Sequence, residues 1–360
     1  IGYGFSRYST DRYFLVPHFE KMLYDNALLM MSYSKAFFIT KKIIYKEVAE
    51  KIATYILREM TSEDGGFYCA QDADSDGVEG KYYVFAYNEI PNLLGNNIGI
   101  EFNKYYDITK QGNFEEKNIP NLLNNKEICG KFDEYLPKIY EYRKNRAKLH
   151  LDDKILTSWN SLMIYAFTLL YRISDNSQYI EVAKKAEQFI SKKLCENETL
   201  FVSYRDGKLG DKGFIDDYAF YIFALIGLYE ATFNKSYLQK AKTFCDKAIN
   251  NFYDTQNGGF YLDGKEIEQL IITPKETYDG AIPSGNSVMA YNLVKFYNIT
   301  QDNKLGELAE NQLAFMSASA TRYPAGFSFY LLALSLYLNP ESITIVLKDK
   351  NDLKNFTHKI

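Results

Sequence analysis

The chain has 360 residues, of which 46% are hydrophobic and 24% charged, and its formal net charge is −4 at pH 7. Because positive and negative residues are interspersed and no basic stretch is present, the composition argues against a nucleic-acid partner. The longest apolar run, 218–229, is about a dozen residues, which is too short to cross a membrane as a helix.

The four cysteines lie far apart, without the spacing of a zinc site or of a disulfide framework. Scattered cysteines of this kind are expected to be reduced thiols. Because reduced thiols are usual in cytoplasmic proteins, we expect a cytoplasmic location. The chain begins at Ile1 and not at a methionine, which is typical of a fragment. The lack of a visible signal peptide therefore carries no weight.

The first predicted element is a helix over 17–38 that begins within VPHFEKMLYDNALL. Pro17 suits the first helical position because its missing N–H is not needed there. At 100° per residue, His18, Lys21 and Asp25 fall on one side of this helix. A helix start with so many ionisable groups among apolar neighbours either pairs them internally or points them into a cavity. We favour the side of His18 and Asp25 as the cavity side.

The chain then repeats one unit, an amphipathic helix that ends in a phenylalanine-bearing turn. The copies are Tyr45–Phe67, Tyr179–Phe201 and Tyr237–Phe260. A helix that is apolar nearly all round precedes each copy, and such a helix belongs inside, against other helices. Alternation of a buried helix with an amphipathic one indicates stacked helical hairpins.

The sequence therefore predicts an all-α fold, an (α/α)6 toroid of helical hairpins over 1–340 with small irregular or β insertions. The predicted helix pairs are 17–38 with 44–61, 157–173 with 177–194, 216–232 with 235–253, and 284–299 with 303–320, before a last inner helix over 325–338. An irregular insertion, 62–156, contains an acidic loop, a strand-like YYVF and helices near 88–94 and 133–149. The tail, 341–360, is expected to be a truncated element or an extra strand.

In such a ring, the loops at the N-termini of the inner helices meet at one rim, where helix dipoles favour carboxylates. The candidate catalytic residues are His18, Glu20, Asp25, Asp72, Asp74, Asp153, Asp217 and Asp279. The candidate substrate-binding residues are Arg7, Tyr8, Lys21, Lys154, Trp159, Asn160, Tyr218, Lys275, Ser284 and Asn286. Taken singly, a polar residue here is explained as well by helix capping, as at Ser158, Asp216 and Ser284.

A buried salt-bridge network is a further alternative, with Lys21 paired to Asp25 and Lys154 beside Asp153. Two carboxylates suit hydrolytic acid–base chemistry, and the chain supplies many. A two-histidine mechanism is less well supplied, because only His18 and His150 are placed to share a pocket.

The acidic loop DADSDG resembles the opening of a calcium-binding loop. The twelfth position of such a loop needs a bidentate glutamate, and here it is Tyr83. We therefore predict no metal ligands, and no cofactor is identified.

Several motifs resemble the YyaL / spermatogenesis-associated thioredoxin-domain family, namely GFSRYSTDRYFLVPHFEKMLYDNALL, CAQDADSDGVEGKYYVF, DDKILTSWNSLMI, DDYAF and PKETYDGAIPSGNS. The resemblance covers the chain from Gly4 to about Asn339. It implies the C-terminal toroid of such a protein without the usual N-terminal thioredoxin-like domain. This toroid is similar in fold to N-acylglucosamine 2-epimerases, cellobiose 2-epimerases and six-hairpin glycosidases.

Apart from Tyr8, the candidate residues above match the family's motifs, as do Tyr24 and Glu79. Two positions depart from the pattern: Ser6 replaces a histidine that many members have, and Ser161 replaces a glycine. The loss of that histidine removes a proton-transfer group and weakens the analogy with epimerases.

Our leading hypothesis is a carbohydrate-active or carbohydrate-binding protein. Carboxylates around His18 and Asp217 would perform acid–base chemistry on a small sugar or sugar derivative, and Tyr8, Trp159 and Tyr218 would offer apolar faces to sugar rings. The rival hypothesis is a non-catalytic scaffold or binding module that works with a thioredoxin-like domain in redox or quality control.

Overall fold

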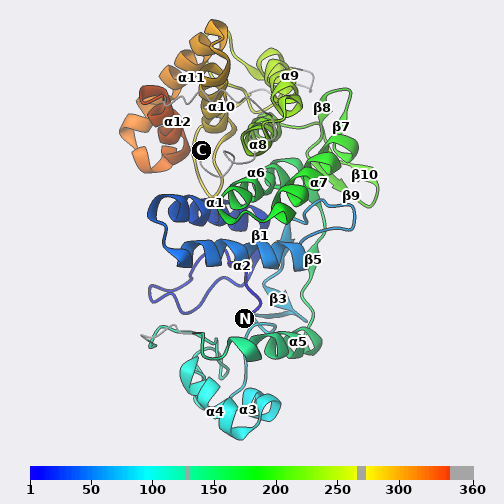
Figure 1. Ribbon diagram of the computed structural model, residues 1–360, viewed down its shortest axis with the longest axis vertical. Helices are drawn as coiled ribbons and strands as arrows, with labels where there is room; N and C mark the ends of the chain where they lie inside the picture. Colours follow the sequence, from blue (N-terminus) through cyan, green and yellow to red (C-terminus); the bar gives the residue numbers. More distant parts are fainter. Residues whose placement is uncertain (126–129, 266–272, 341–360) are drawn as a thin grey trace. The chain divides into compact units, whose positions relative to one another are not determined.

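The computed structural model of the chain describes residues 1–125, 130–265 and 273–340 (Figure 1). Two compact units make up the chain. Unit 1 contains Ile1–Asn26, Lys51–Met60 and Cys69–Asp153. Unit 2 contains Ala27–Glu50, Thr61–Tyr68 and the chain from Lys154 onward. The predicted tail, 341–360, lies outside the described residues.

The described part of the chain is mainly helical, which confirms the prediction of an all-α fold. Its α-helices are α1 Leu23–Thr40, α2 Ile43–Glu59, α3 Glu89–Leu94, α4 Asn96–Tyr105, α5 Leu136–Arg146, α6 Thr157–Ser174, α7 Ser177–Lys193, α8 Ile215–Thr232, α9 Lys235–Phe252, α10 Gly285–Thr300, α11 Asn303–Arg322 and α12 Ser328–Leu338. Two 3-10 helices precede α5 and α12, at Asp133–Tyr135 and Pro324–Phe327. None of the helices in the described ranges combines the length and apolar character needed to cross a bilayer.

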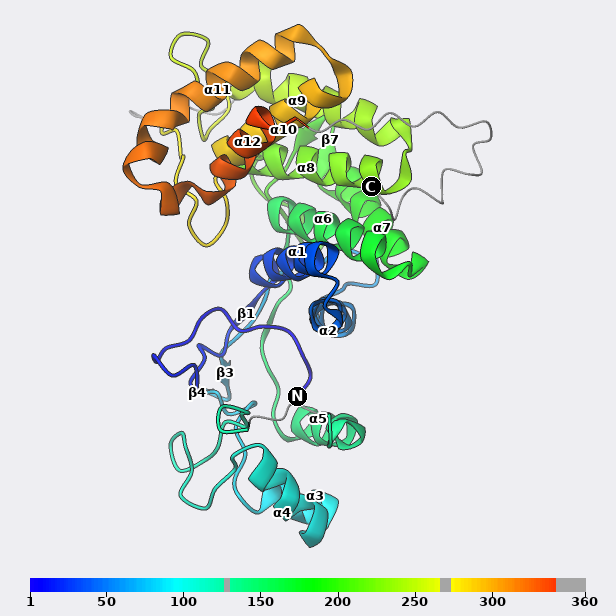
Figure 2. The same ribbon diagram turned by 60° about the vertical axis from the view of Figure 1, so that its left-hand side comes forward.

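The inner helices of unit 2 pack on one another in the order α6, α8, α10, α12 (Figures 1 and 2). The amphipathic helices α7, α9 and α11 each pack against the inner helix that precedes them. Nearly every side chain of α8 is buried, from Ile215 to Leu228, because this helix has neighbours on several sides. The predicted alternation of buried and amphipathic helices is confirmed for these hairpins.

The same turn joins each of these helix pairs. The inner helix ends on a residue with positive φ, and the next residue caps the following helix by accepting a hydrogen bond from the N–H two positions later. The terminal residues are Asp175, Phe233 and Gln301, and the caps are Asn176, Asn234 and Asp302, each at 3.0 Å. This two-residue connection holds the helices antiparallel and adjacent.

Short strands accompany the helices. In unit 1, β1 Lys21–Met22, β2 Ala70–Gln71 and β5 Leu151–Asp152 form one antiparallel sheet, and β3 Asp74–Ser75 pairs with β4 Val78–Glu79. In unit 2, β6 Ile155–Leu156, β9 Ser203–Arg205 and β10 Lys208–Leu209 form another sheet, and β7 Cys195–Glu196 pairs with β8 Thr199–Leu200. These strands fix the loops that precede α1, α6 and α8.

The predicted start of the first helix at Pro17 is wrong, because α1 begins at Leu23. Pro17 forms a bridge with Ser9, and Lys21 pairs with Gln71 in the β1–β2 ladder. The backbone groups of this stretch are therefore already bonded in extended pairing and are not available to a helix.

One further prediction in the insertion is wrong, and one helix there was not predicted. The strand-like YYVF is a turn, in which the N–H groups of Tyr83 and Val84 both bond the Gly80 carbonyl. Helix α4 was not predicted, because its glycine and asparagines disfavour helix. Gly99 is nevertheless required there, since a Cβ at this position would lie 2.3 Å from the Pro91 Cα on α3.

Candidate functional site

The candidate site of unit 1 is built on two paired segments near the start of the chain. The Arg7 N–H bonds the Glu20 carbonyl at 3.1 Å, and the His18 N–H bonds the Tyr8 carbonyl at 2.9 Å. The carboxylate of Asp11 closes the intervening loop by accepting backbone hydrogen bonds from Tyr13, Leu15 and Val16. This pairing brings Arg7, Tyr8, His18 and Glu20 together immediately before α1.

Their side chains interact directly. Arg7 Nη1 lies 3.1 Å from Glu20 Oε2, and His18 Nδ1 lies 3.9 Å from the same oxygen. The Tyr8 ring stacks on the His18 ring with centroids 5.1 Å apart, and Tyr8 is 55% exposed. The first turn of α1 adds Tyr24 and Asp25, because both carry electrostatic interactions with Arg7 and Glu20. We call Arg7, Tyr8, His18, Glu20, Tyr24 and Asp25 the entry cluster.

Two atoms of the entry cluster are buried without a hydrogen-bond partner among the residues that the structure describes, His18 Nδ1 and Asp25 Oδ2. Burial raises the pKa of Asp25 to about 6, and the negative charge of Glu20 adds to this while Arg7 opposes it. Burial also raises the pKa of the Tyr24 hydroxyl. With a pKa of about 6, the Asp25 carboxyl group can take up or release a proton near neutral pH.

Lys21 does not belong to the entry cluster. Its ammonium donates to the Tyr3 carbonyl at 2.7 Å and lies over the rings of Tyr55 and Tyr83, at 4.9 and 5.2 Å from their centroids. Burial lowers its pKa to about 7, and Arg143 adds to the effect. Because Lys21 lies on β1, the predicted helical pairing of Lys21 with Asp25 is wrong.

The acidic loop is a β-hairpin. Asp76 and Gly77 have φ of 53° and 73° between β3 and β4, the left-handed pair that a two-residue hairpin turn requires. Asp72 and Asp74 are both exposed on it. Among the residues with described positions, no three His, Cys, Asp or Glu side chains gather as metal ligands would.

Three further candidates lie where the chain passes from unit 1 to unit 2. Asp153 and Trp159 are half-buried, and Lys154 is exposed. Each of the three residues takes part in at least one interaction.

Asn160 and Asn286, predicted to bind substrate, bind backbone instead. Asn160 accepts a hydrogen bond from the Phe67 N–H at 2.7 Å and donates to the Phe67 carbonyl at 2.9 Å. Asn286 makes the same two bonds to Phe260, at 2.7 and 2.9 Å. Both phenylalanines end a repeat of the sequence, so Asn160 on α6 and Asn286 on α10 each hold the turn at the end of the preceding repeat. We call these pairs the asparagine clamps.

A third clamp lies in unit 1. Asn26 on α1 accepts from the Phe5 N–H at 2.8 Å and donates to the Phe5 carbonyl at 3.0 Å. The amide of a clamp uses both its carbonyl and its NH₂ group on protein backbone. Backbone binding therefore accounts for the asparagines of all three motifs.

Asp217 has a similar capping role. Its Oδ2 accepts from the Phe214 N–H at 3.0 Å, and its Oδ1 accepts from the Ser158 N–H at 3.1 Å, so one carboxylate caps the starts of α8 and α6. Burial raises its pKa to about 7, and the neighbouring charge of Asp216 contributes. Tyr218 is buried and its hydroxyl accepts from the Leu200 N–H at 3.2 Å.

The capping predictions at Ser158 and Asp216 are wrong, because the N-cap positions of α6 and α8 are Leu156 and Phe214. Asp217 reaches back to bond these first turns instead. Asp216 was considered at the rim and interpreted as a helix cap, yet its Oδ1 is buried without a hydrogen-bond partner in the described structure, and burial raises its pKa to about 6. The two adjacent aspartates of the DDYAF motif are the feature of the sequence that points to this position.

Asp279 and Ser284 hold the start of α10. Ser284 is its N-cap, as predicted, and accepts from the Ser287 N–H at 3.2 Å. Asp279 Oδ1 accepts from the Ser284 N–H at 2.9 Å, and Oδ2 accepts from the Phe329 N–H at 2.8 Å. This buried carboxylate therefore ties α10 to α12.

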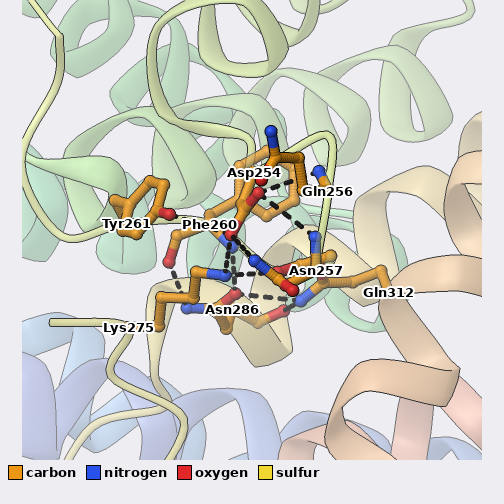
Figure 3. Close-up of polar contacts among 9 residues, drawn as sticks. Asp254, Gln256, Asn257, Phe260, Tyr261, Lys275, Asn286 and Gln312 are labelled. Carbon is orange, nitrogen blue, oxygen red and sulfur yellow. Dashed lines mark hydrogen bonds and ion pairs between the residues drawn. The ribbon is translucent and has the colours of Figure 1, made fainter.

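Lys275 is bound within a polar network of unit 2 that the sequence did not predict (Figure 3). Its ammonium lies 2.7 Å from Asp254 Oδ2 and donates to the Gly258 carbonyl at 2.6 Å. Tyr261 donates to the same Asp254 oxygen at 2.8 Å. The hydrogen bond from Lys275 lowers the pKa of Asp254. This arrangement braces the turn that the Asn286 clamp holds.

Sequence comparison identifies relatives that are longer than this chain, whereas no family model matches it. The chain is 31% identical to spermatogenesis-associated protein 20 of Homo sapiens, over 93% of this chain and 49% of that protein. It is 32% identical to the Mus musculus protein of the same name, over 83% and 44%. The chain thus spans about half the length of the curated relatives it matches. These matches confirm the resemblance seen in the motifs.

Among solved structures, a sugar epimerase from a ruminal bacterium has a TM-score of 0.57 and 13% identity, covering 88% of this chain and 64% of that chain. A D-mannose isomerase has a TM-score of 0.46 and 14% identity, covering 88% and 81%. At 13% identity, the first likeness establishes the fold alone. It confirms the predicted class of helical-hairpin toroids.

Proposed function

Because the chain is homologous to proteins named spermatogenesis-associated protein 20 and spans about half of their length, we propose its function from its own residues: acid–base chemistry on a small sugar at the entry cluster. The coarser part of this statement, a fold shared with a sugar-processing enzyme, rests on the likeness to the epimerase. The chemistry is a hypothesis that rests on the entry cluster.

One observation carries the proposal. His18 Nδ1 and Asp25 Oδ2 are buried and lack hydrogen-bond partners within the described chain, although both belong to one charged cluster. An unsatisfied buried polar atom is costly unless it serves another purpose. Binding of a polyhydroxyl ligand would satisfy both atoms, because a hydroxyl group donates to one atom and accepts from another.

The residues have distinct roles in this proposal. Asp25 transfers a proton, because its pKa of about 6 lets it hold or release one near neutral pH. His18 is the second proton-transfer group, held by its stacking on Tyr8. Arg7 keeps Glu20 in place through their ion pair. The exposed face of Tyr8 offers an apolar surface on which a sugar ring can lie.

The test is a screen of monosaccharides and disaccharides with the full chain, in which NMR follows both epimerisation and hydrolysis. We expect Asp25→Asn to lower kcat by about a hundredfold or more, the usual contribution of a general acid or base. Asp246→Asn, on the exposed face of α9, is the matched control and should leave kcat unchanged. Thermal melting of both variants checks that they remain folded.

A folded wild-type chain that converts no sugar and is stabilised by none contradicts the proposal. Equal activity of wild type and Asp25→Asn contradicts the assignment of Asp25. The first outcome leaves the scaffold hypothesis, in which the chain binds a thioredoxin-like domain without catalysis.

A further inference from the structure

The two paired segments of the entry cluster join through a short loop that carries two exposed aromatic side chains. Where the pairing ends, the Thr10 N–H bonds the Val16 carbonyl at 2.8 Å, and residues 11–15 lie between them. Tyr13 is 64% exposed, and Phe14 is 80% exposed, the largest fraction among the large apolar side chains with described positions. We call residues 11–15 the aromatic loop.

Hydrogen bonds fix the backbone of the aromatic loop. The Asp11 carboxylate accepts from the N–H groups of Tyr13 and Val16. The Thr10 hydroxyl donates to the Val16 carbonyl at 2.9 Å, and the Arg12 guanidinium lies 4.8 Å from the centroid of the Tyr13 ring. The loop therefore presents its rings in an arrangement that exists before a ligand arrives, which lowers the entropy lost on binding.

The backbone of Phe14 is strained. Its φ is 60°, in the left-handed region that residues other than glycine, asparagine and aspartate rarely adopt. This conformation costs free energy, and the exposed Phe14 ring offsets little of it, because the ring buries little apolar surface. The folded chain alone gives no reason for a phenylalanine at this position, whereas a ligand that covers the ring does.

The aromatic loop and the entry cluster share the solvent side of the paired segments. Leu15 and Val16 pack against a small core that contains Phe19, so this side of the segments is covered. Tyr8, with its ring 55% exposed, lies on the open side. Residues of an extended segment advance by about 3.3 Å each, so the loop begins about 7–10 Å along the chain from Tyr8. A ligand bound at the entry cluster can therefore extend to the loop.

The size of the exposed surface indicates which kind of ligand fits. A fully covered aromatic side chain buries about 150–250 Å², so the two rings together offer at most about 500 Å². A stable protein interface needs roughly 800 Å² on each partner. A sugar ring, in contrast, has an apolar face of C–H groups about as large as one aromatic ring.

We propose that the aromatic loop binds the second ring of an oligosaccharide whose first ring lies at the entry cluster. Tyr13 and Phe14 offer the faces on which the second ring packs. The inference rests on the proposed function and names its substrate class, a sugar of two or more rings. A monosaccharide would leave both side chains uncovered.

Calorimetric titration of the full chain with glucose, mannose and N-acetylglucosamine, and with cellobiose, mannobiose and chitobiose, tests the inference. We expect at least one disaccharide to bind about two- to tenfold more tightly than its monosaccharide, which is the contribution of an aromatic contact. Phe14→Asn should abolish this gain, and Phe14→Trp should retain it. Because asparagine tolerates a positive φ, Phe14→Asn should unfold at a urea midpoint no lower than that of wild type, which a merely structural role of the ring does not predict.

Phe38→Asn is the matched control, because Phe38 is an exposed phenylalanine on α1. It should leave the gain unchanged. Equal affinities for one ring and for two overturn this inference and leave the proposed function standing, whereas binding of no sugar at all contradicts both. Sedimentation of wild type, but not of Phe14→Asn, with phosphatidylcholine vesicles would assign the aromatic loop to a lipid surface and would also overturn the inference.

Discussion

Asp25 lies in the first turn of α1, where the helix dipole favours a negative charge, yet its pKa is raised. A dipole contributes about 0.3–1 kcal/mol at a helix terminus, whereas one pKa unit corresponds to about 1.4 kcal/mol. The upward shift to about 6 therefore means that burial outweighs both the dipole and Arg7. The folded chain holds the Asp25 proton more tightly than the unfolded chain does.

This difference predicts how stability depends on pH. Since the folded pKa of Asp25 exceeds its ordinary value of 3.8, its contribution is fully present below that value and is lost as the pH rises through about 6. Asp25→Asn cannot ionise, so its free energy of unfolding relative to wild type should rise between pH 5 and pH 8. We expect a change on the order of 1 kcal/mol, after allowance for partial exposure.

Urea denaturation at both pH values measures this change. Asp246→Asn is again the control, because Asp246 is exposed on α9. A difference between Asp25→Asn and wild type that stays constant with pH would contradict the assigned burial of the charge.

Some residues of the candidate site could be predicted from the kinds of side chain in the sequence. Arg7, Tyr8, His18, Glu20 and Asp25 were all candidates, and the structure brings them together. Their arrangement was not predictable from helical periodicity, because it depends on backbone pairing between the segments around Tyr8 and His18. Asp217 was predicted to be a catalytic carboxylate, but both its oxygens accept hydrogen bonds from backbone N–H groups.

Helices were the most predictable elements, because the 3.6-residue period of apolar side chains is a direct signal. Predicted ranges such as 157–173 and 235–253 agree closely with α6 and α9. The asparagine clamps were not predictable, since Asn160 acts on Phe67, which lies 93 positions away in the sequence. Their polar side chains were interpreted as ligand-binding groups because periodicity does not reveal a distant backbone partner.

The clamps should contribute strongly to stability. Asn160→Ala leaves the buried Phe67 N–H and carbonyl without their partner, and such losses cost about 1–3 kcal/mol for each unsatisfied group. We expect a loss of about 3 kcal/mol in the free energy of unfolding, measured as a lower urea midpoint with an unchanged m-value. We expect a similar loss in the free energy of unfolding for Asn286→Ala.

Asn250→Ala is the control for this prediction, because Asn250 is exposed on α9. Its change should stay within about 0.5 kcal/mol. If the clamp variants were as stable as this control, the clamps would not be holding the turns.

On the scale of the whole molecule, the chain passes between unit 1 and unit 2 five times, after Asn26, Glu50, Met60, Tyr68 and Asp153. A single linker therefore does not separate the two units. Helices α1 and α2 each contribute residues to both units, so unfolding of one unit breaks helices that the other needs.

This interleaving predicts one cooperative unfolding transition. Trp159, the only tryptophan, lies in unit 2, so its fluorescence follows that unit alone, while far-UV circular dichroism follows the helices of both. The two signals should give the same urea midpoint. Two separated midpoints would show that the units unfold independently.

The asparagine clamps also bear on the order in which the molecule assembles. The amide of Phe67 is protected from solvent exchange only when α6 has formed beside it, and the amide of Phe260 only when α10 has formed. Each turn is thus completed by the hairpin that follows it, so native structure should spread from one hairpin to the next. Pulse-labelling of these two amides during refolding would time the docking of successive hairpins, because each amide reports on the helix that clamps it.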